Sequence, residues 1–238
     1  MARRAEGGAI SELTGRDTGL VRRLVSVPPG ARLDGAAGSG GELWFVIRGG
    51  GLLDAGELRG APLGRDTGLW IPPGARYRLQ ADPRDEVLLD AVALPAPAAP
   101  PFPPAPPYPP ASPSPFAAAP RLSRLGDCEI EVTGDRKFRV LLGPGRGCDA
   151  ATQFRGEIPQ GKAPEHSHPY DEVVRILEGE GVAHARGADL PLAPGTCIRL
   201  PRGLPHCLEN TGSATLVVLG VFHPGGSSAA KVTTAGSD

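Results

Sequence analysis

What the sequence has least of limits the function classes open to it. Aromatic residues make up 5% of the 238 residues, so the cores must be built mainly from Val, Leu, Ile and Ala. Neither sign of charge dominates, since 25 Lys and Arg stand against 26 Asp and Glu, and a basic footprint for nucleic acid is missing. The longest apolar run, residues 214–222, is far shorter than the ~20 residues of a membrane span. We therefore expect no nucleic-acid partner and no membrane partner.

The cysteines and the amino terminus also lack a recognisable pattern. Cys128, Cys148, Cys197 and Cys207 form no Cys-x-x-Cys pair, which favours reduced, buried thiols. The basic residues near the start of the sequence are not followed by an apolar stretch, so we do not expect a signal peptide. Both observations favour a cytoplasmic protein.

A proline-rich segment divides the sequence. About half of residues 95–120 are proline, and most of the others are Ala or Ser. Proline cannot donate a hydrogen bond to a β-ladder and favours an extended polyproline II chain, so we predict a spacer, with a ligand for an SH3-like partner as the alternative. The predicted organisation is a disordered tail over 1–20, a first domain over 21–94, the linker over 95–120, a second domain over 121–226 and a flexible tail over 227–238.

Histidine is missing from the first 165 residues, and three of the five histidines then form a spaced set with a glutamate. Alternate side chains of a strand point to one face, so an extended chain aims His166 and His168 at the same point. Glu172 keeps the same parity, and the apolar run after it predicts a strand that ends at Gly179. His206 must come from a neighbouring strand. Three imidazoles and one carboxylate are a metal-binding set.

These residues lie in two patterns that resemble the signature motifs of the cupin superfamily. The first pattern contains Gly161, His166, His168, Glu172 and Gly179, and the second contains Gly195, Pro201, Gly203, His206 and Asn210. The first departs from the family in one respect, because four residues rather than five separate Gly161 from His166. The resemblance covers roughly residues 125–225 and implies a small antiparallel β-barrel with the metal inside its wider end.

The first half of the chain resembles a degenerate copy of the same unit. Glu42 precedes Gly49 by the interval that separates Glu172 from Gly179, and residues 69–74 parallel residues 198–203. The positions of the first two histidines fall near Ala36 to Gly38, and the position of His206 falls on Tyr77. We therefore predict an all-β bicupin: two cupin-like antiparallel β-barrels joined by the proline-rich linker, with metal in the second barrel only.

The ligand set indicates one divalent transition metal. One carboxylate beside three imidazoles favours Fe, Mn or Ni, with Zn or Cu possible, and the absence of cysteine argues against a closed structural zinc site. The resemblance implies a metal-dependent oxygenase of the dioxygenase type, acting on a small oxygenated organic molecule, in which Glu172 could act as a base while it binds the metal. The alternatives are a metal-dependent isomerase or epimerase for a sugar or other small molecule, and a non-catalytic small-molecule binding protein. The family also suggests a homodimer.

One further residue is a candidate for holding an anionic substrate. Arg155 lies in an expected strand over residues 152–158 and could hold an anion if its face lines the barrel. Alternation with Phe154 and Ile158 instead favours the apolar face as the inner one. His184 and His223 have no partner at ligand spacing and are not predicted to bind metal.

Overall fold

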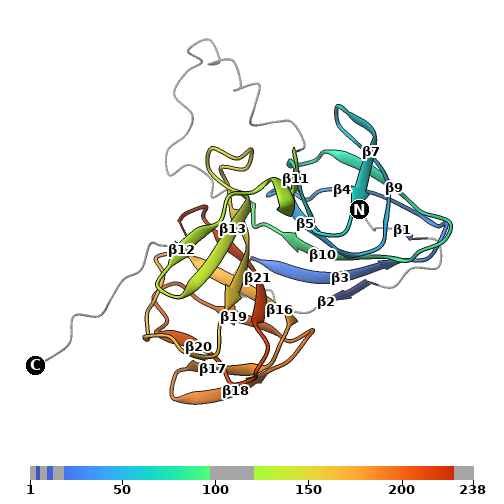
Figure 1. The fold of residues 1–238 in the computed structure, drawn as a ribbon. Coiled ribbons are helices and arrows are strands. Elements are labelled where there is room, and N and C mark those ends of the chain that lie inside the picture. The colour runs from blue at the N-terminus through green and yellow to red at the C-terminus, as the bar shows by residue number, and fades with distance from the viewer. Residues whose placement is uncertain (1–3, 6–9, 13–18, 97–120, 228–238) are drawn as a thin grey trace, which may run out of the picture. The chain divides into compact units, whose positions relative to one another are not determined.

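The computed structural model describes residues 4–5, 10–12, 19–96 and 121–227 (Figure 1). The chain divides into two compact units, Met1–Arg124 and Leu125–Asp238. Each unit consists of two antiparallel sheets, which together make the predicted all-β fold of two cupin-like barrels. The predicted linker and carboxy-terminal tail lie almost entirely outside the described residues.

The first unit holds a five-stranded and a six-stranded sheet. The order in the smaller sheet is β1 (Arg4–Ala5), β4 (Arg32–Ala36), β9 (Arg76–Ala81), β6 (Gly50–Ala55), β7 (Leu58–Gly64). The order in the larger sheet is β11 (Arg121–Arg124), β8 (Thr67–Ile71), β5 (Glu42–Arg48), β10 (Val87–Ala93), β3 (Val21–Val27), β2 (Ile10–Glu12). Alternating apolar residues of both sheets meet in one buried core.

Three short strands extend the first unit beyond its predicted bounds. The segment 1–20, expected to be a disordered tail, contributes β1, which pairs with β4, and β2, which pairs with β3. Strand β11, expected in the second domain, pairs with β8, so Arg121 lies opposite Trp70. The division between the units therefore falls after Arg124. Short edge strands of this kind are set by long-range pairing, which local sequence patterns do not reveal.

The second unit holds a six-stranded and a four-stranded sheet and begins with a short 3₁₀ helix, η1 (Leu125–Asp127). The order in the larger sheet is β12 (Glu131–Thr133), β13 (Arg136–Leu142), β14 (Thr152–Ile158), β21 (Leu216–His223), β16 (Asp171–Glu178), β19 (Cys197–Leu200). The order in the smaller sheet is β15 (Gly161–Lys162), β20 (His206–Asn210), β17 (Gly181–Ala185), β18 (Ala188–Leu192).

The two units share one strand register, which supports the predicted duplication. Glu42 pairs with Ile71 as Glu172 pairs with Leu200. Tyr77 occupies the position of His206. Its Cα partners in the first unit are Gly35 and Ala55, whereas those of His206 are His166 and Ala185. Gly35 therefore stands in the place of His166, one residue before the expected range.

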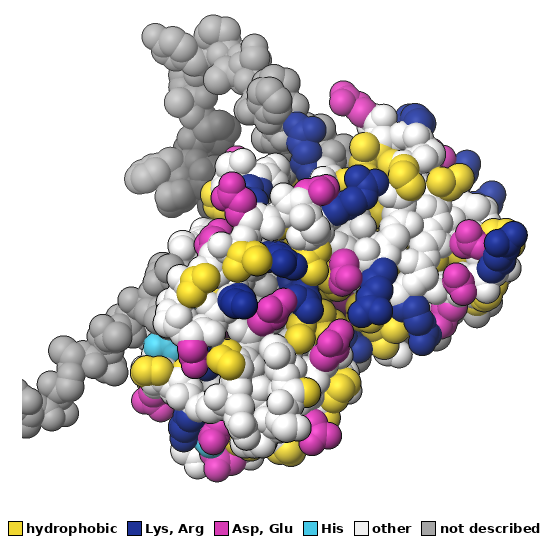
Figure 2. Space-filling model, viewed as in Figure 1, with side chains coloured by type: hydrophobic (Ala, Val, Ile, Leu, Met, Phe, Trp, Pro, Cys, Tyr) yellow, Lys and Arg dark blue, Asp and Glu magenta, His cyan; other side chains and the backbone are white. Residues whose placement is uncertain are grey.

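The surface carries charges of both signs. In the face shown in Figure 2, Lys and Arg side chains alternate with Asp and Glu, and no basic patch stands out on that face. Among the described residues, no helix is both long and apolar enough to pass through a membrane.

Candidate metal centre and its cavity

His166 and His206 are brought together by a direct backbone pairing. The amide of His166 donates to the carbonyl of His206 at 3.0 Å, and the amide of His206 donates back at 2.9 Å. Residues that exchange hydrogen bonds in an antiparallel pair project their side chains to the same face. The two imidazole ring centroids consequently lie 4.7 Å apart.

His168 is placed by the turn that the second motif encodes. The amide of Gly203 donates to the carbonyl of His168 at 2.8 Å, and Gly203 has a φ of +71°, a conformation that glycine adopts without penalty. The ligand atoms of His166, His168 and His206 all lie within 4.8 Å of one another. Backbone hydrogen bonds thus connect the two motifs and bring the three imidazoles together.

Glu172, near the start of β16, faces the same point. Its Oε2 lies 3.8 Å from Nε2 of His168 and 3.9 Å from Nε2 of His206. Glu172, His168 and His206 are all buried. The structure therefore brings together all four residues that the sequence predicted as ligands.

Backbone carbonyls orient two of the rings. Nδ1 of His166 lies 3.1 Å from the carbonyl of Pro164, and Nδ1 of His206 lies 2.8 Å from the carbonyl of Leu204. An Nδ1–H that donates to a carbonyl leaves Nε2 with its lone pair, which is the usual arrangement around a protein-bound metal. Burial lowers the pKa of His206, against the opposing effect of the Leu204 carbonyl, and so favours the neutral imidazole. This donor set fits a divalent transition metal that prefers nitrogen with one hard oxygen.

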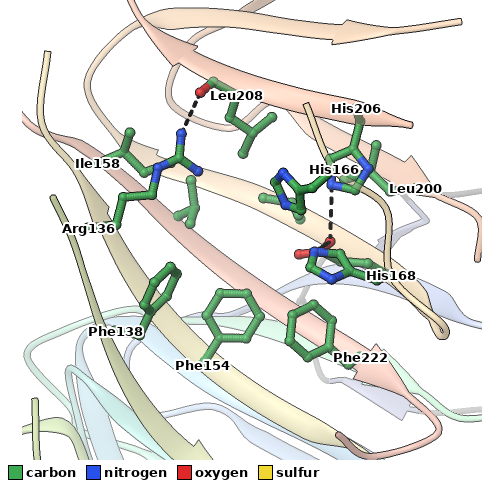
Figure 3. Close-up of a pocket in the computed structure, with 13 residues that line it drawn as sticks. Arg136, Phe138, Phe154, Ile158, His166, His168, Leu200, His206, Leu208 and Phe222 are labelled. Atoms are coloured by element: carbon green, nitrogen blue, oxygen red, sulfur yellow. Dashed lines mark hydrogen bonds and ion pairs between the residues drawn. The ribbon is translucent and has the colours of Figure 1, made fainter. Parts of the chain in front are cut away.

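A small cavity opens beside the cluster (Figure 3). Its volume is about 50 Å³, on a scale on which one water needs ~10–15 Å³, so it suits a ligand of a few heavy atoms. Apart from the cluster and one arginine, its walls are hydrocarbon: Phe138, Phe154, Ile158, Val174, Leu200, Leu208, Val218 and Phe222. Three of the six phenylalanines of the chain are in this wall.

The arginine is Arg136, which is not among the site residues predicted from the sequence. It opens β13, is only 8% exposed, and its Nη2 donates to the carbonyl of Leu208 at 2.8 Å. Burial lowers the pKa of its guanidinium. The signal that could have found it is the alternation along β13, because Arg136 shares a strand face with Phe138, which also lines the cavity.

The remaining polar candidates lie away from the cavity. Arg155 forms an ion pair with Glu157 beside a separate surface depression, while Phe154 and Ile158 line the cavity beside the three histidines, as the alternation indicated. His184 bonds Asp189 and Glu209, and Nδ1 of His223 lies 3.1 Å from the carbonyl of Ala150.

All four cysteines are free thiols, and none of them lines the cavity. Among the described residues, the three histidines are the one group of His, Cys, Asp and Glu side chains found close enough together to hold a metal.

A two-barrel β protein with a histidine-rich centre in one barrel is the class defined by this fold and site. Residues 157–222 match the model of the cupin domain. An oxalate-binding protein from Thermotoga maritima is 38% identical over 70 residues, which are 29% of this chain and 58% of the relative, so the match spans little more than half of that protein.

Solved structures share a fold that extends over both units of the chain. A putative glyoxylate-induced protein from Pseudomonas aeruginosa superposes with a TM-score of 0.72 at 14% identity, covering 91% of this chain and 80% of that one. Oxalate decarboxylase from Lactobacillus farciminis, solved as its formate complex, gives 0.71 at 17% identity and covers 92% and 82%. The second unit therefore carries a cupin domain, and the two units together have a fold like that of these solved structures.

Proposed function

We propose that the second barrel binds one divalent transition metal through His166, His168, Glu172 and His206 and acts there on a small, oxygen-rich organic molecule. The observation that carries this proposal is the convergence of three imidazoles within 4.8 Å, beside Glu172, at the edge of an apolar cavity. Four protein ligands leave room for a small molecule in a five- or six-coordinate site. A redox-active metal held there would supply one-electron chemistry and Lewis acidity.

Of the predicted reaction classes, the oxygenase remains our leading proposal. An isomerase or epimerase needs positioned groups that remove and return a proton. Apart from the four proposed ligands, Arg136 is the one titratable side chain that lines the described cavity, and an arginine stays protonated. Glu172 would have to act as base while binding metal. This shortage of proton-transfer groups favours redox chemistry over isomerisation.

The relatives suggest the first compounds to test. The Thermotoga maritima relative is named for oxalate binding, and oxalate decarboxylases share the fold. Manganese(II) centres are described for the Bacillus subtilis oxalate decarboxylase, which has a TM-score of 0.71 at 15% identity. A two-carbon acid also suits a cavity of about 50 Å³. We therefore propose manganese first, then iron and nickel, with zinc and copper as further possibilities.

A non-catalytic binding protein is the second candidate, and the name of the Thermotoga maritima relative favours it. In that case the metal would only hold ligand oxygens, and the loaded protein would bind oxalate without consuming it or taking up oxygen. The homodimer and the cytoplasmic location remain predictions.

The test is elemental analysis of the full-length protein with two variants. We expect about one transition metal per chain, lost in His206→Ala and kept in His184→Ala, because His184 lies outside the cluster. His206→Ala with full metal content would contradict the ligand set. Oxygen uptake and product analysis with oxalate and other small oxygenated acids then separate enzyme from binder. Turnover without oxygen uptake would move the proposal from oxygenase to another reaction class.

A further inference from the structure

Arg136 is a buried cation without a carboxylate partner among the described residues. Its one hydrogen bond goes to the uncharged carbonyl of Leu208. The acid that acts on it electrostatically is Asp135, its chain neighbour, which forms no ion pair with it. In the first barrel, by contrast, Arg22 is fully buried and pairs with Asp90 at 2.8 Å. Buried charges are normally paired, because the desolvation of a lone ion costs several kcal/mol.

The unused donors of Arg136 open onto the metal cavity. A guanidinium carries five N–H donors in a planar fork, and the Leu208 carbonyl engages only one nitrogen. No nitrogen of Arg136 is both fully buried and without a partner, so the other donors are accessible from the cavity. In Figure 3 the side chain reaches into the cavity from the side opposite His166 and His206.

The rest of the wall restricts what can bind between these two ends. Phe138 and Phe154 lie on the wall near Arg136 and offer no hydrogen bonds (Figure 3). A ligand must therefore place its anionic group at Arg136. Its remaining oxygen atoms, which would coordinate the metal, then lie at the cluster. A planar carboxylate matches the guanidinium fork with two parallel hydrogen bonds. A volume of about 50 Å³ favours an acid of a few heavy atoms over a sugar or an aromatic acid.

We infer that Arg136 is the anion-binding residue of this cavity, and that its ligand is a small carboxylate whose other oxygens reach the cluster of His166, His168, Glu172 and His206. This inference rests on the proposed function and specifies its substrate class. It assigns to Arg136 the role that the sequence had offered to Arg155.

The experiment measures carboxylate binding to the manganese-loaded, full-length protein by isothermal titration calorimetry. Oxalate and glyoxylate serve as ligands, and oxamide serves as the uncharged match for oxalate. In Arg136→Met we expect the dissociation constant for oxalate to rise roughly 10- to 100-fold, as for loss of hydrogen bonds between charged groups. Arg136→Lys keeps the charge but not the fork and should fall between wild type and Arg136→Met. The control Arg155→Met removes an arginine outside the cavity and should bind oxalate as the wild type does.

Stability and metal content separate this role from a structural one. Because Arg136 lacks a carboxylate partner, Arg136→Met should keep or raise the melting temperature of the ligand-free protein and retain its manganese. A lowered melting temperature with unchanged oxalate affinity would assign Arg136 to structure and overturn the inference. A metal-loaded wild type that binds oxamide as tightly as oxalate, or binds no small carboxylate, would also overturn it. A wild type that takes up no metal would instead overturn the proposed function itself.

Discussion

The two barrels are built on one register but differ in what occupies the interior. In the second, three histidines and Glu172 lie beside an open cavity. In the first, Tyr77 stands at the position of His206. Its ring packs edge-on against Trp44, with the two ring centroids 4.6 Å apart. Both aromatic side chains are buried in the core of that unit. In this chain, the barrel with a cavity is the one that has the three histidines and lacks the bulky aromatic side chains at these positions.

The glutamate position shows how the same residue takes two roles. Glu172 faces two imidazoles, whereas Glu42 accepts a hydrogen bond from the Trp44 indole at 2.9 Å. A buried carboxylate needs polar partners in either barrel. Gly35 completes the exchange, since a Cβ there would lie 2.3 Å from the Tyr77 hydroxyl. Gly35, at the position of His166, thus leaves space for the ring of Tyr77, at the position of His206.

The largest effect is expected from emptying the first barrel. Trp44→Ala removes a side chain that is 1% exposed and should destabilise the first unit by about 3–5 kcal/mol. Both tryptophans of the chain, Trp44 and Trp70, lie in this unit, so Trp70 fluorescence during guanidinium denaturation reports on it alone. Leu52→Ala, at a residue 54% exposed, is the control and should stay within about 0.5 kcal/mol. A loss below about 1 kcal/mol for Trp44→Ala would contradict a packed interior.

Filling the second barrel is the reciprocal change. Val174 lies two residues after Glu172, as Trp44 lies two residues after Glu42, and it lines the cavity. Val174→Trp should abolish oxalate binding, because the ring occupies the cavity, and should destabilise the second unit by about 1–3 kcal/mol. Calorimetry and the thermal transition measure the two effects. The control Val174→Ala enlarges the cavity and should preserve oxalate binding. If Val174→Trp bound oxalate as tightly as the wild type, the ligand would not occupy this cavity.

The convergence of the four proposed ligands in the second barrel could be predicted from the sequence because the spacing within the two motifs carries it. Alternation fixes the side on which His166 and His168 project, and the turn around Gly203 returns the chain for His206. The fold class followed from the same motifs. The interior of the first barrel was predicted only to lack metal ligands, since the filling by Trp44 and Tyr77 depends on contacts between distant strands.

Arg136 and the short strands at the ends of the first unit could not be placed for the same reason. Arg136 reaches the cavity only because β13 pairs with β14, and a one-residue slip in that register would turn it outward. Strand β11 follows the proline-rich segment and shows no pattern that indicates β8 as its partner. Local periodicity predicts which side chains share a face, but pairing decides which faces meet.

A smaller effect is expected from replacing the turn glycine of each barrel, and only the turn at Gly203 is expected to influence metal binding. Gly203 and Gly74 occupy equivalent turns, with φ of +71° and +70°, and open space surrounds a Cβ at either position. Replacing either with Ala should destabilise its unit by about 1–2 kcal/mol through backbone strain alone. Only Gly203→Ala should also weaken metal binding, because the Gly203 amide holds the His168 carbonyl, whereas Gly74 donates to Ala37 and Gly38. Metal titration of both variants tests this difference. If Gly203→Ala bound metal as tightly as Gly74→Ala, the turn at Gly203 would not position His168.

The smallest effect concerns the outer surface, where the barrels differ in charge. His184 occupies the register position of Asp54 and bonds Glu209 at 2.8 Å and Asp189 at 2.6 Å. Glu209 first, and Asp189 second, raise the pKa of His184 above its ordinary value. The protonated form is then favoured in the folded state, so its stabilisation is present below the unfolded pKa of about 6.5 and is lost as pH rises through the folded pKa.

An NMR titration of the histidine side chains measures this shift directly. His223, whose pKa is lowered by burial, provides an internal reference of opposite sign. Glu209→Gln should bring the His184 pKa down further than Asp189→Asn, because the bond to Glu209 makes the larger contribution. If His184 titrated below His223, the surface ion pairs would not persist in solution, and the charge difference between the barrels would have no effect on stability.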